Sequence, residues 1–174
     1  MNENFDREKA CACLAETVAA VFADMAFIDA VTLAESIAAE PAAEPAAATE
    51  SAPASSRPGP SSEVLERCAL DVLKPVSCRL ELALSPGLHR KIVEILLGES
   101  DVKGGADDSI LEMLNVIAGG FLTSYFGLGV EIKLELPRYL FLEDESGGDI
   151  VCSADFDAEG ERLSAILRSI RYRY

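Results

Sequence analysis

Residues 108–126 read DSILEMLNVIAGGFLTSYF, and this stretch decides how the rest of the chain is interpreted. Its apolar residues recur every three or four positions, which is the spacing of one side of an α-helix. That side holds Ile110, Ile117, Phe121 and Tyr125. The opposite side of the helix is polar. At about 100° per residue, its polar and small residues all lie within about 60° of Glu112. They are Asp108, Asn115, Gly119 and Thr123. The stretch therefore predicts an amphipathic helix, with Asp107 or Asp108 as its N-cap.

The polar side of this helix is made of residues that weaken a helix. Asn115 is a poor helix former, and each glycine of Gly119-Gly120 costs on the order of 1 kcal/mol relative to alanine in a helix interior. Exposed Glu and Asn are common on solvated helices, so a surface without a function is one interpretation. A docking surface is the other, because small residues let the backbone of another protein approach closely.

The flanking sequence predicts a sheet and further helices. Apolar runs that alternate or continue predict five strands, of which the last could also be a short helix. These runs are 69–76, 78–84, 130–136, 150–156 and 163–170, and Pro137 closes the third. Ser85-Pro86 predicts the start of a helix that Gly98 ends. The sum is an α+β fold, an antiparallel sheet covered by helices.

The chain of 174 residues is long enough for one domain with one core. Residues 1–37 are expected to form an N-terminal helix that packs on the core, since apolar residues recur there with helical spacing from Asp6 to about Ile28. Residues 38–62 are rich in Pro, Ala and Ser and predict a flexible insert. Residues 63–174 supply the remainder of the single domain.

Charge and composition exclude several kinds of partner. The formal net charge of −15 repels phosphate backbones and anionic lipid head groups, so neither nucleic acid nor a membrane is expected as a partner. The first residues show no signal-peptide pattern, and we expect a cytoplasmic protein. In that compartment the odd set of five cysteines is expected to stay reduced in the core. These are Cys11, Cys13, Cys68, Cys78 and Cys152.

Common catalytic motifs are absent from the sequence, including phosphate loops, nucleophile elbows and zinc motifs. His89 is the only histidine and is predicted to lie on the solvated side of a helix. Asp155-Phe-Asp157 could bind a cation weakly, although an acidic strand end is the simpler interpretation. No metal site of the protein's own is predicted.

The spacing Asp108-x3-Glu112-x2-Asn115, followed after 21 residues by Pro137, resembles the signature of the chemotaxis phosphatase family that includes CheX, CheC and FliY. The Asn-to-Pro spacing is one residue shorter than in the family pattern. The preceding stretch, which ends in Leu96-Leu97-Gly98, is similar to the preceding helix of the family. The resemblance covers about residues 14–156 without the insert.

The family fold consists of two pseudo-repeats, and the sequence allows them to be compared. When Glu16 is aligned with Glu112, Ala19 falls at the position of Asn115, so only the second copy has both residues. A single Glu/Asn pair resembles CheX more than CheC. FliY would need a further C-terminal domain.

The resemblance implies a phosphatase that hydrolyses the phosphoaspartate of a CheY-type response-regulator receiver domain. It implies that Asn115 and Glu112 are the catalytic residues, that Asp108, Gly119 and Thr123 contact the partner, and that Pro137 is a structural part of the motif. No cofactor of its own is expected, because the receiver brings its Mg²⁺. The resemblance also suggests a homodimer, formed through sheet edges.

A competing hypothesis is a catalytically silent module that binds or sequesters a receiver domain. A third is an acidic scaffold whose helix is only solvated surface.

Overall fold

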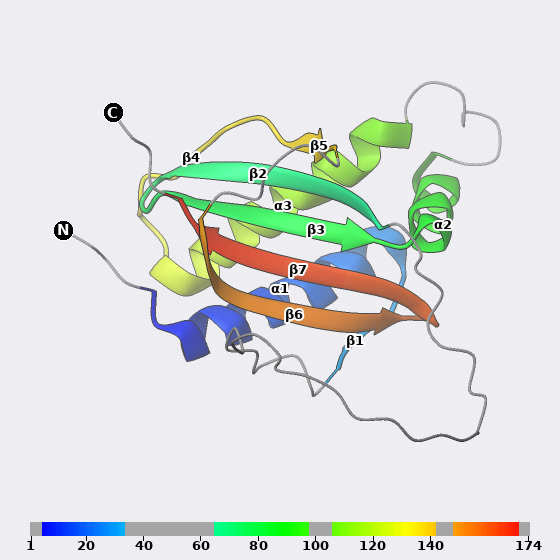
Figure 1. Cartoon of the computed structure of the whole chain (residues 1–174), viewed down its shortest axis with the longest axis horizontal. Coiled ribbons are helices and arrows are strands. Elements are labelled where there is room, and N and C mark those ends of the chain that lie inside the picture. The colour runs from blue at the N-terminus through cyan, green and yellow to red at the C-terminus, as the bar shows by residue number, and fades with distance from the viewer. Residues whose placement is uncertain (1–4, 34–64, 98–105, 142–147, 171–174) are drawn as a thin grey trace, which may run out of the picture.

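The computed structural model describes residues 5–33, 65–97, 106–141 and 148–170 (Figure 1). Its helices and strands follow one another in this order: α1 (Arg7–Ala26), β1 (Ala30–Thr32), β2 (Glu66–Lys74), β3 (Cys78–Leu84), α2 (Pro86–Leu97), α3 (Ala106–Phe126), β4 (Lys133–Leu134), β5 (Arg138–Leu140), β6 (Asp149–Ala158) and β7 (Glu161–Ser169). The predicted insert at 38–62 lies outside the described residues.

The strands form one antiparallel sheet in the order β1-β6-β7-β3-β2-β4, and β5 also pairs with β2. Two hairpins build its centre. One joins β2 to β3, with Leu70 opposite Leu80, and the other joins β6 to β7. The pairing of β3 with β7 brings the two hairpins together.

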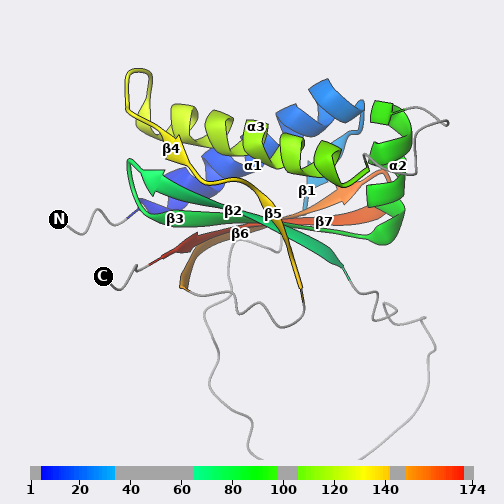
Figure 2. The ribbon, with the colours of Figure 1, turned by 90° about the horizontal axis from the view of Figure 1, so that it is seen from above.

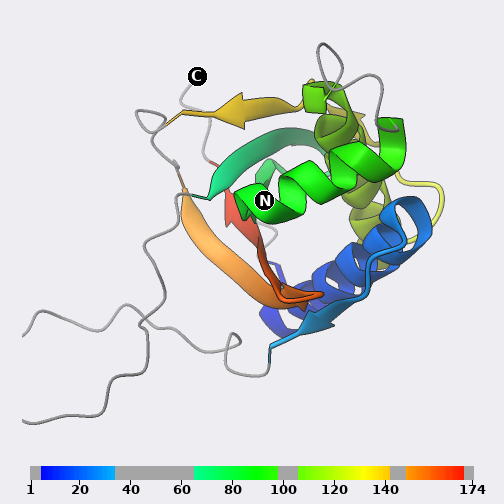
Figure 3. The ribbon, with the colours of Figure 1, turned by 90° about the vertical axis from the view of Figure 1, so that its right-hand side faces the viewer.

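All three helices lie on the same side of this sheet (Figures 2 and 3). Alternation along the strands explains the arrangement, because every second side chain of β2, β3 and β7 is an apolar residue that points to that side. The long helices α1 and α3 lie next to each other across it, and α2 stands at one end. The core between the layers is buried and apolar, and its residues include Leu14, Val18, Phe22, Leu70, Leu80, Leu82, Ile117, Phe121, Phe156 and Leu167.

The α+β class and the antiparallel sheet under helices are therefore confirmed. The strand predicted over 130–136 is much shorter, because only Lys133 and Leu134 pair with β2, where the register shifts between Val72 and Lys74. Pairing with β2 resumes after Pro137, where the chain forms β5. Strand β1 was not predicted, since three residues are too few to show a period. Helix α3 begins at Ala106, so Asp108 lies inside its first turn and is not its cap.

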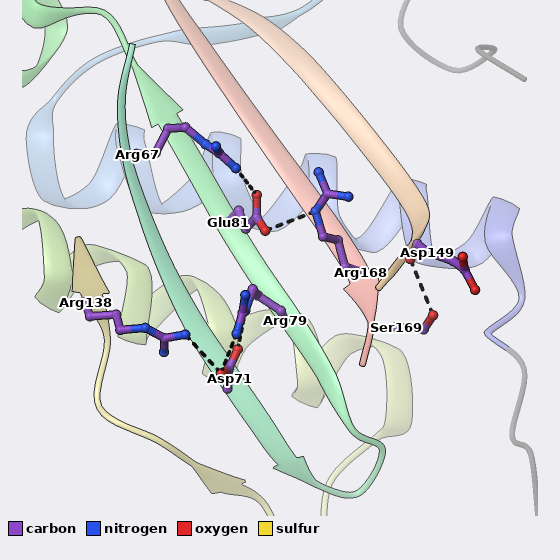
Figure 4. A network of polar contacts seen from close by, with 8 residues as sticks. All are labelled: Arg67, Asp71, Arg79, Glu81, Arg138, Asp149, Arg168 and Ser169. Atoms are coloured by element: carbon purple, nitrogen blue, oxygen red, sulfur yellow. Dashed lines mark hydrogen bonds and ion pairs between the residues drawn. The ribbon is translucent and has the colours of Figure 1, made fainter. Parts of the chain in front are cut away.

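The face of the sheet turned away from the helices carries ion pairs (Figure 4). Glu81 on β3 is 1% exposed and accepts hydrogen bonds from Arg67 at 2.8 Å and Arg168 at 3.0 Å. Asp71 on β2 accepts two hydrogen bonds from Arg79, at 2.6 and 2.9 Å, and one from Arg138 at 3.3 Å. Each buried carboxylate thus lies between two arginines, which meets the requirement that a buried charge be paired.

Burial by itself would raise the pKa of Asp71. The hydrogen bonds and positive charges of Arg79 and Arg138 outweigh this effect and hold the pKa below its ordinary value of 3.8. A carboxyl group with a lowered pKa stabilises the fold above its ordinary pKa, and that stabilisation is lost as the pH falls below it.

We expect Asp71→Asn to lower the free energy of unfolding at pH 7 by roughly 1–3 kcal/mol, because it leaves two partly buried arginines poorly paired. The difference from the unsubstituted protein should shrink as the pH falls below the ordinary pKa of 3.8. Urea denaturation at pH 7 and pH 3 measures both values, and the exposed Asp24→Asn serves as the control. An equal difference at both pH values would contradict the assigned role of the charge.

Candidate functional site

Helix α3 has one apolar and one polar side, as the sequence predicts. Its apolar side is buried against the sheet and α1, through Ile110, Met113, Leu114, Ile117 and Phe121. On the other side, Asp108, Glu112, Asn115 and Thr123 are exposed, and Gly119 is half-buried. We call these five residues the polar side of α3. Glu112 and Asn115 are three positions apart, so both project from the same surface about one turn from each other.

The start of α1 fixes the end of α3. The backbone N–H of Asp6 donates to the Tyr125 hydroxyl at 2.7 Å, and Lys9 Nζ donates to the Tyr125 carbonyl at 2.7 Å. Lys9 Nζ also lies 4.7 Å from the centre of the Tyr125 ring, within the range of a cation–π interaction. A lysine at these last carbonyl groups is favourable for the helix dipole. Helix α3, which bears the polar side, is therefore bound to α1 at its C-terminal end.

The two glycines of α3 serve different purposes. A Cβ atom on Gly120 would lie 2.8 Å from Cγ2 of Thr17 on α1, so glycine is required there for the two helices to pack closely. A Cβ atom on Gly119 would meet nothing within 4 Å. Packing within the described residues gives no reason for glycine at position 119, whereas the approach of another molecule would.

Chemically, the polar side offers carboxylates and one neutral amide. In the described part of the chain, no ion pair or side-chain hydrogen bond engages Asp108, Glu112 or Asn115, so these groups are available to a partner. Thr123 differs, because its hydroxyl donates to the Gly119 carbonyl of its own helix at 2.8 Å. The residues that the structure describes include no group of three or more His, Cys, Asp or Glu side chains able to hold a metal ion.

Pro137 is not a residue of α3. It lies between β4 and β5 at the edge of the sheet, while Glu112 and Asn115 lie on a helix above the sheet (Figure 2). Residues before and after Pro137 both bind Asp71. The Asp71 carbonyl accepts a hydrogen bond from the Glu135 N–H, and the Asp71 carboxylate pairs with Arg138. The position fits a structural role in the turn of the edge strand.

Two predictions about individual side chains have different outcomes. The solvated position predicted for His89 is wrong, because its side chain is only 16% exposed and Nδ1 pairs with Glu66 at the start of β2. The ring also lies beside Tyr139 of β5, so the first turns of α2 pack against the sheet edge. For Asp155 and Asp157 the structure favours a strand end, because Asp155 accepts from Ser164 and Asp157 accepts from the Gly160 N–H in the β6–β7 turn.

The cysteines occupy the core as expected. All five are buried with free thiols. Burial raises the pKa of Cys68 and of Cys78 to about 12, and it also raises that of Cys152. These three thiols are protonated at neutral pH and poorly suited to act as nucleophiles.

One described helix, α3, is long and apolar enough to cross a membrane, as judged by length and composition alone. The stretch concerned is Asp108–Phe126. In the fold its apolar side chains pack against the sheet and α1, so the core accounts for them.

No protein-family model matches the sequence, and no curated protein matches it either. Solved structures do match the fold. The chemotaxis protein CheX from Vibrio vulnificus superposes with a TM-score of 0.65 and 12% sequence identity, over 94% of this chain and 98% of that one. CheX from Borrelia burgdorferi, solved in a complex with CheY, BeF3 and Mg²⁺, gives a TM-score of 0.58 and 14% identity, over 92% and 97%. A CheC-like protein from Shewanella oneidensis gives 0.56 and 13%, over 97% and 99%.

These matches cover nearly the whole of each chain, and they establish a CheX/CheC-like fold. Because identity is only 10–14% among the CheX and CheC-like structures, the likeness shows the fold alone, and any function must be argued from the residues.

Substitution of the two glycines tests their assigned purposes. We expect Gly119→Ala to raise the free energy of unfolding by about 0.5–1 kcal/mol, because alanine is the better helix former. Gly120→Ala should be less stable than Gly119→Ala by roughly 1–3 kcal/mol, since its Cβ overpacks against Thr17. Thermal and urea denaturation measure both values.

Thr17→Ser supplies the matched control for the second glycine. It removes only Cγ2 and keeps the hydroxyl that donates to the Cys13 carbonyl. The double variant Thr17→Ser/Gly120→Ala should regain most of the lost stability. A failure to regain it would show that the contact at Thr17 is not the reason for glycine at position 120.

Proposed function

We propose that this chain is a phosphatase for the phosphoaspartate of a response-regulator receiver domain and acts in chemotaxis or a related two-component signal. One observation carries the proposal: Glu112 and Asn115 lie exposed and one turn apart on α3, at the spacing of the chemotaxis phosphatase signature, in a CheX/CheC-like fold. The B. burgdorferi neighbour was solved bound to CheY, which supports a receiver as the partner.

The reaction transfers a phosphoryl group to water. Water attacks the phosphorus atom, the bond between the phosphorus and the aspartyl oxygen breaks, and the products are inorganic phosphate and the aspartate carboxylate. Such a transfer depends mostly on positioning and charge stabilisation. The carboxamide of Asn115 accepts a hydrogen bond from the attacking water and donates one to the phosphoryl group. Because it is neutral, it does not repel that group as a carboxylate would.

Glu112 has a different role in the proposal. Its carboxylate, exposed and without an ion pair in the described residues, pairs with a lysine of the receiver and docks α3 against the phosphorylated aspartate. Asp108 lies one turn earlier, where negative charge is favoured by the helix dipole, and contributes to the same docking. In this proposal the Mg²⁺ is brought by the receiver.

The open space at Gly119 supports the same arrangement. A partner whose backbone approaches α3 between Asn115 and Thr123 meets no side chain at position 119. The stability that glycine forfeits is then explained by access for the receiver.

The test is the rate of phosphate loss from a receiver domain labelled on its aspartate, in Mg²⁺, with and without this protein. We expect acceleration by the unsubstituted protein and a loss of roughly 100-fold with Asn115→Ala, because the water is no longer oriented. Ser124→Ala, an exposed change on the same helix, should leave the rate unchanged.

Binding of the same receiver separates the enzyme from a silent module. Complex formation without acceleration would contradict the phosphatase and favour the module. No binding across a panel of receivers would contradict both.

A further inference from the structure

The exposed side of α3 is too small to form a specific interface by itself. From Asp108 to Thr123 it extends over roughly 22 Å, and a helix with its side chains is about 10 Å wide. That strip amounts to a few hundred Å², whereas a stable specific interface buries about 800 Å² on each partner. A receiver that docks on Glu112 and Asn115 must therefore cover a neighbouring element as well.

Helices α1 and α2 both pack against α3, and α1 is the longer of the two. Helices α1 and α3 approach closely where Thr17 meets Gly120, so Glu16, the preceding residue, lies on the part of α1 that is close to α3. Leu14 and Val18 on either side of Glu16 are buried toward the sheet, and Glu16 itself is exposed. Glu16 and Glu112 thus point away from the sheet on the same surface of the molecule.

Beyond the first turn of α1, the charged residues of this surface are acidic. From residue 10 to the end of α1, and throughout α3, the sequence contains acidic residues but no lysine or arginine. Glu16 forms no ion pair within the described residues. Arginines that pair with buried carboxylates lie on the opposite face of the sheet, as Arg67, Arg79, Arg138 and Arg168 do. A carboxylate left without a cation on the surface that the partner must cover is complementary to a basic group of that partner.

We infer that the docking surface extends from α3 onto α1, and that Glu16 is a second residue that contacts the receiver and sets its affinity. The inference rests on the proposed function. Position 120 lies five residues from Asn115, about 7.5 Å along the helix, and the axes of two packed helices are about 8–10 Å apart. Glu16 is therefore too far from Asn115 to act on the reacting atoms, and it contributes to binding and not to the chemical step.

The experiment compares the affinity of a CheY-type receiver, activated with Mg²⁺ and beryllofluoride, for the unsubstituted full chain and its substituted forms. We expect Glu16→Gln to weaken binding about fivefold, Glu16→Lys to weaken it further, and the unsubstituted protein to lose affinity as salt is added. Glu135→Gln, which removes an exposed charge at the sheet edge, is the control and should bind normally. In turnover, Glu16→Gln should raise KM and leave kcat unchanged.

The outcomes are distinguishable. Normal binding by Glu16→Gln and Glu16→Lys, together with weakened binding by Glu112→Gln, would overturn the inference and leave the proposed function intact. Equal weakening by Glu16→Gln and Glu135→Gln would also overturn it, because net charge alone would then explain the effect. A receiver panel that does not bind the unsubstituted protein would overturn both.

Discussion

The sheet turns its large buried apolar side chains to one face, and the rest of the structure follows from this constraint. Both long helices must lie on that face, where they pack side by side and leave their outer sides to solvent. The other face is polar and holds its two buried carboxylates, Asp71 and Glu81, through pairs of arginines. A molecule built in this way concentrates on its sheet surface the arginines that pair with buried carboxylates.

Helix α3 meets two demands at once. Ile117 and Phe121 are needed in the core, while Asn115 and Gly119 on the outer side weaken the helix. The fold compensates through packing, since Gly120 admits Thr17 and Lys9 holds the last turn. Destabilising residues on the outer side of a helix, offset by packing on its inner side, are expected where a surface binds a partner.

The sequence predicts the elements whose apolar pattern repeats over many residues. Residues 108–126 repeat their apolar pattern over five turns, so the helix and its polar side were predictable. The four long strands were also predictable, although residues 163–170 fitted a short helix as well. Strand β1, the short length of β4 and strand β5 were not, because they depend on pairing with distant strands and extend over only two or three residues. His89 was misplaced for the same reason, since its neighbours Glu66 and Tyr139 come from other elements. The catalytic roles of Glu112 and Asn115 remain predictions.

The central claim is that the outer side of α3 is the functional surface, and amide NMR tests it most directly. The ¹⁵N-labelled chain would be titrated with a receiver activated by Mg²⁺ and beryllofluoride. The account predicts that the largest shifts lie at Glu112, Asn115 and Gly119, with little change at Arg79 and Arg168 on the far face of the sheet. Shifts concentrated on that far face, with α3 unaffected, would contradict it.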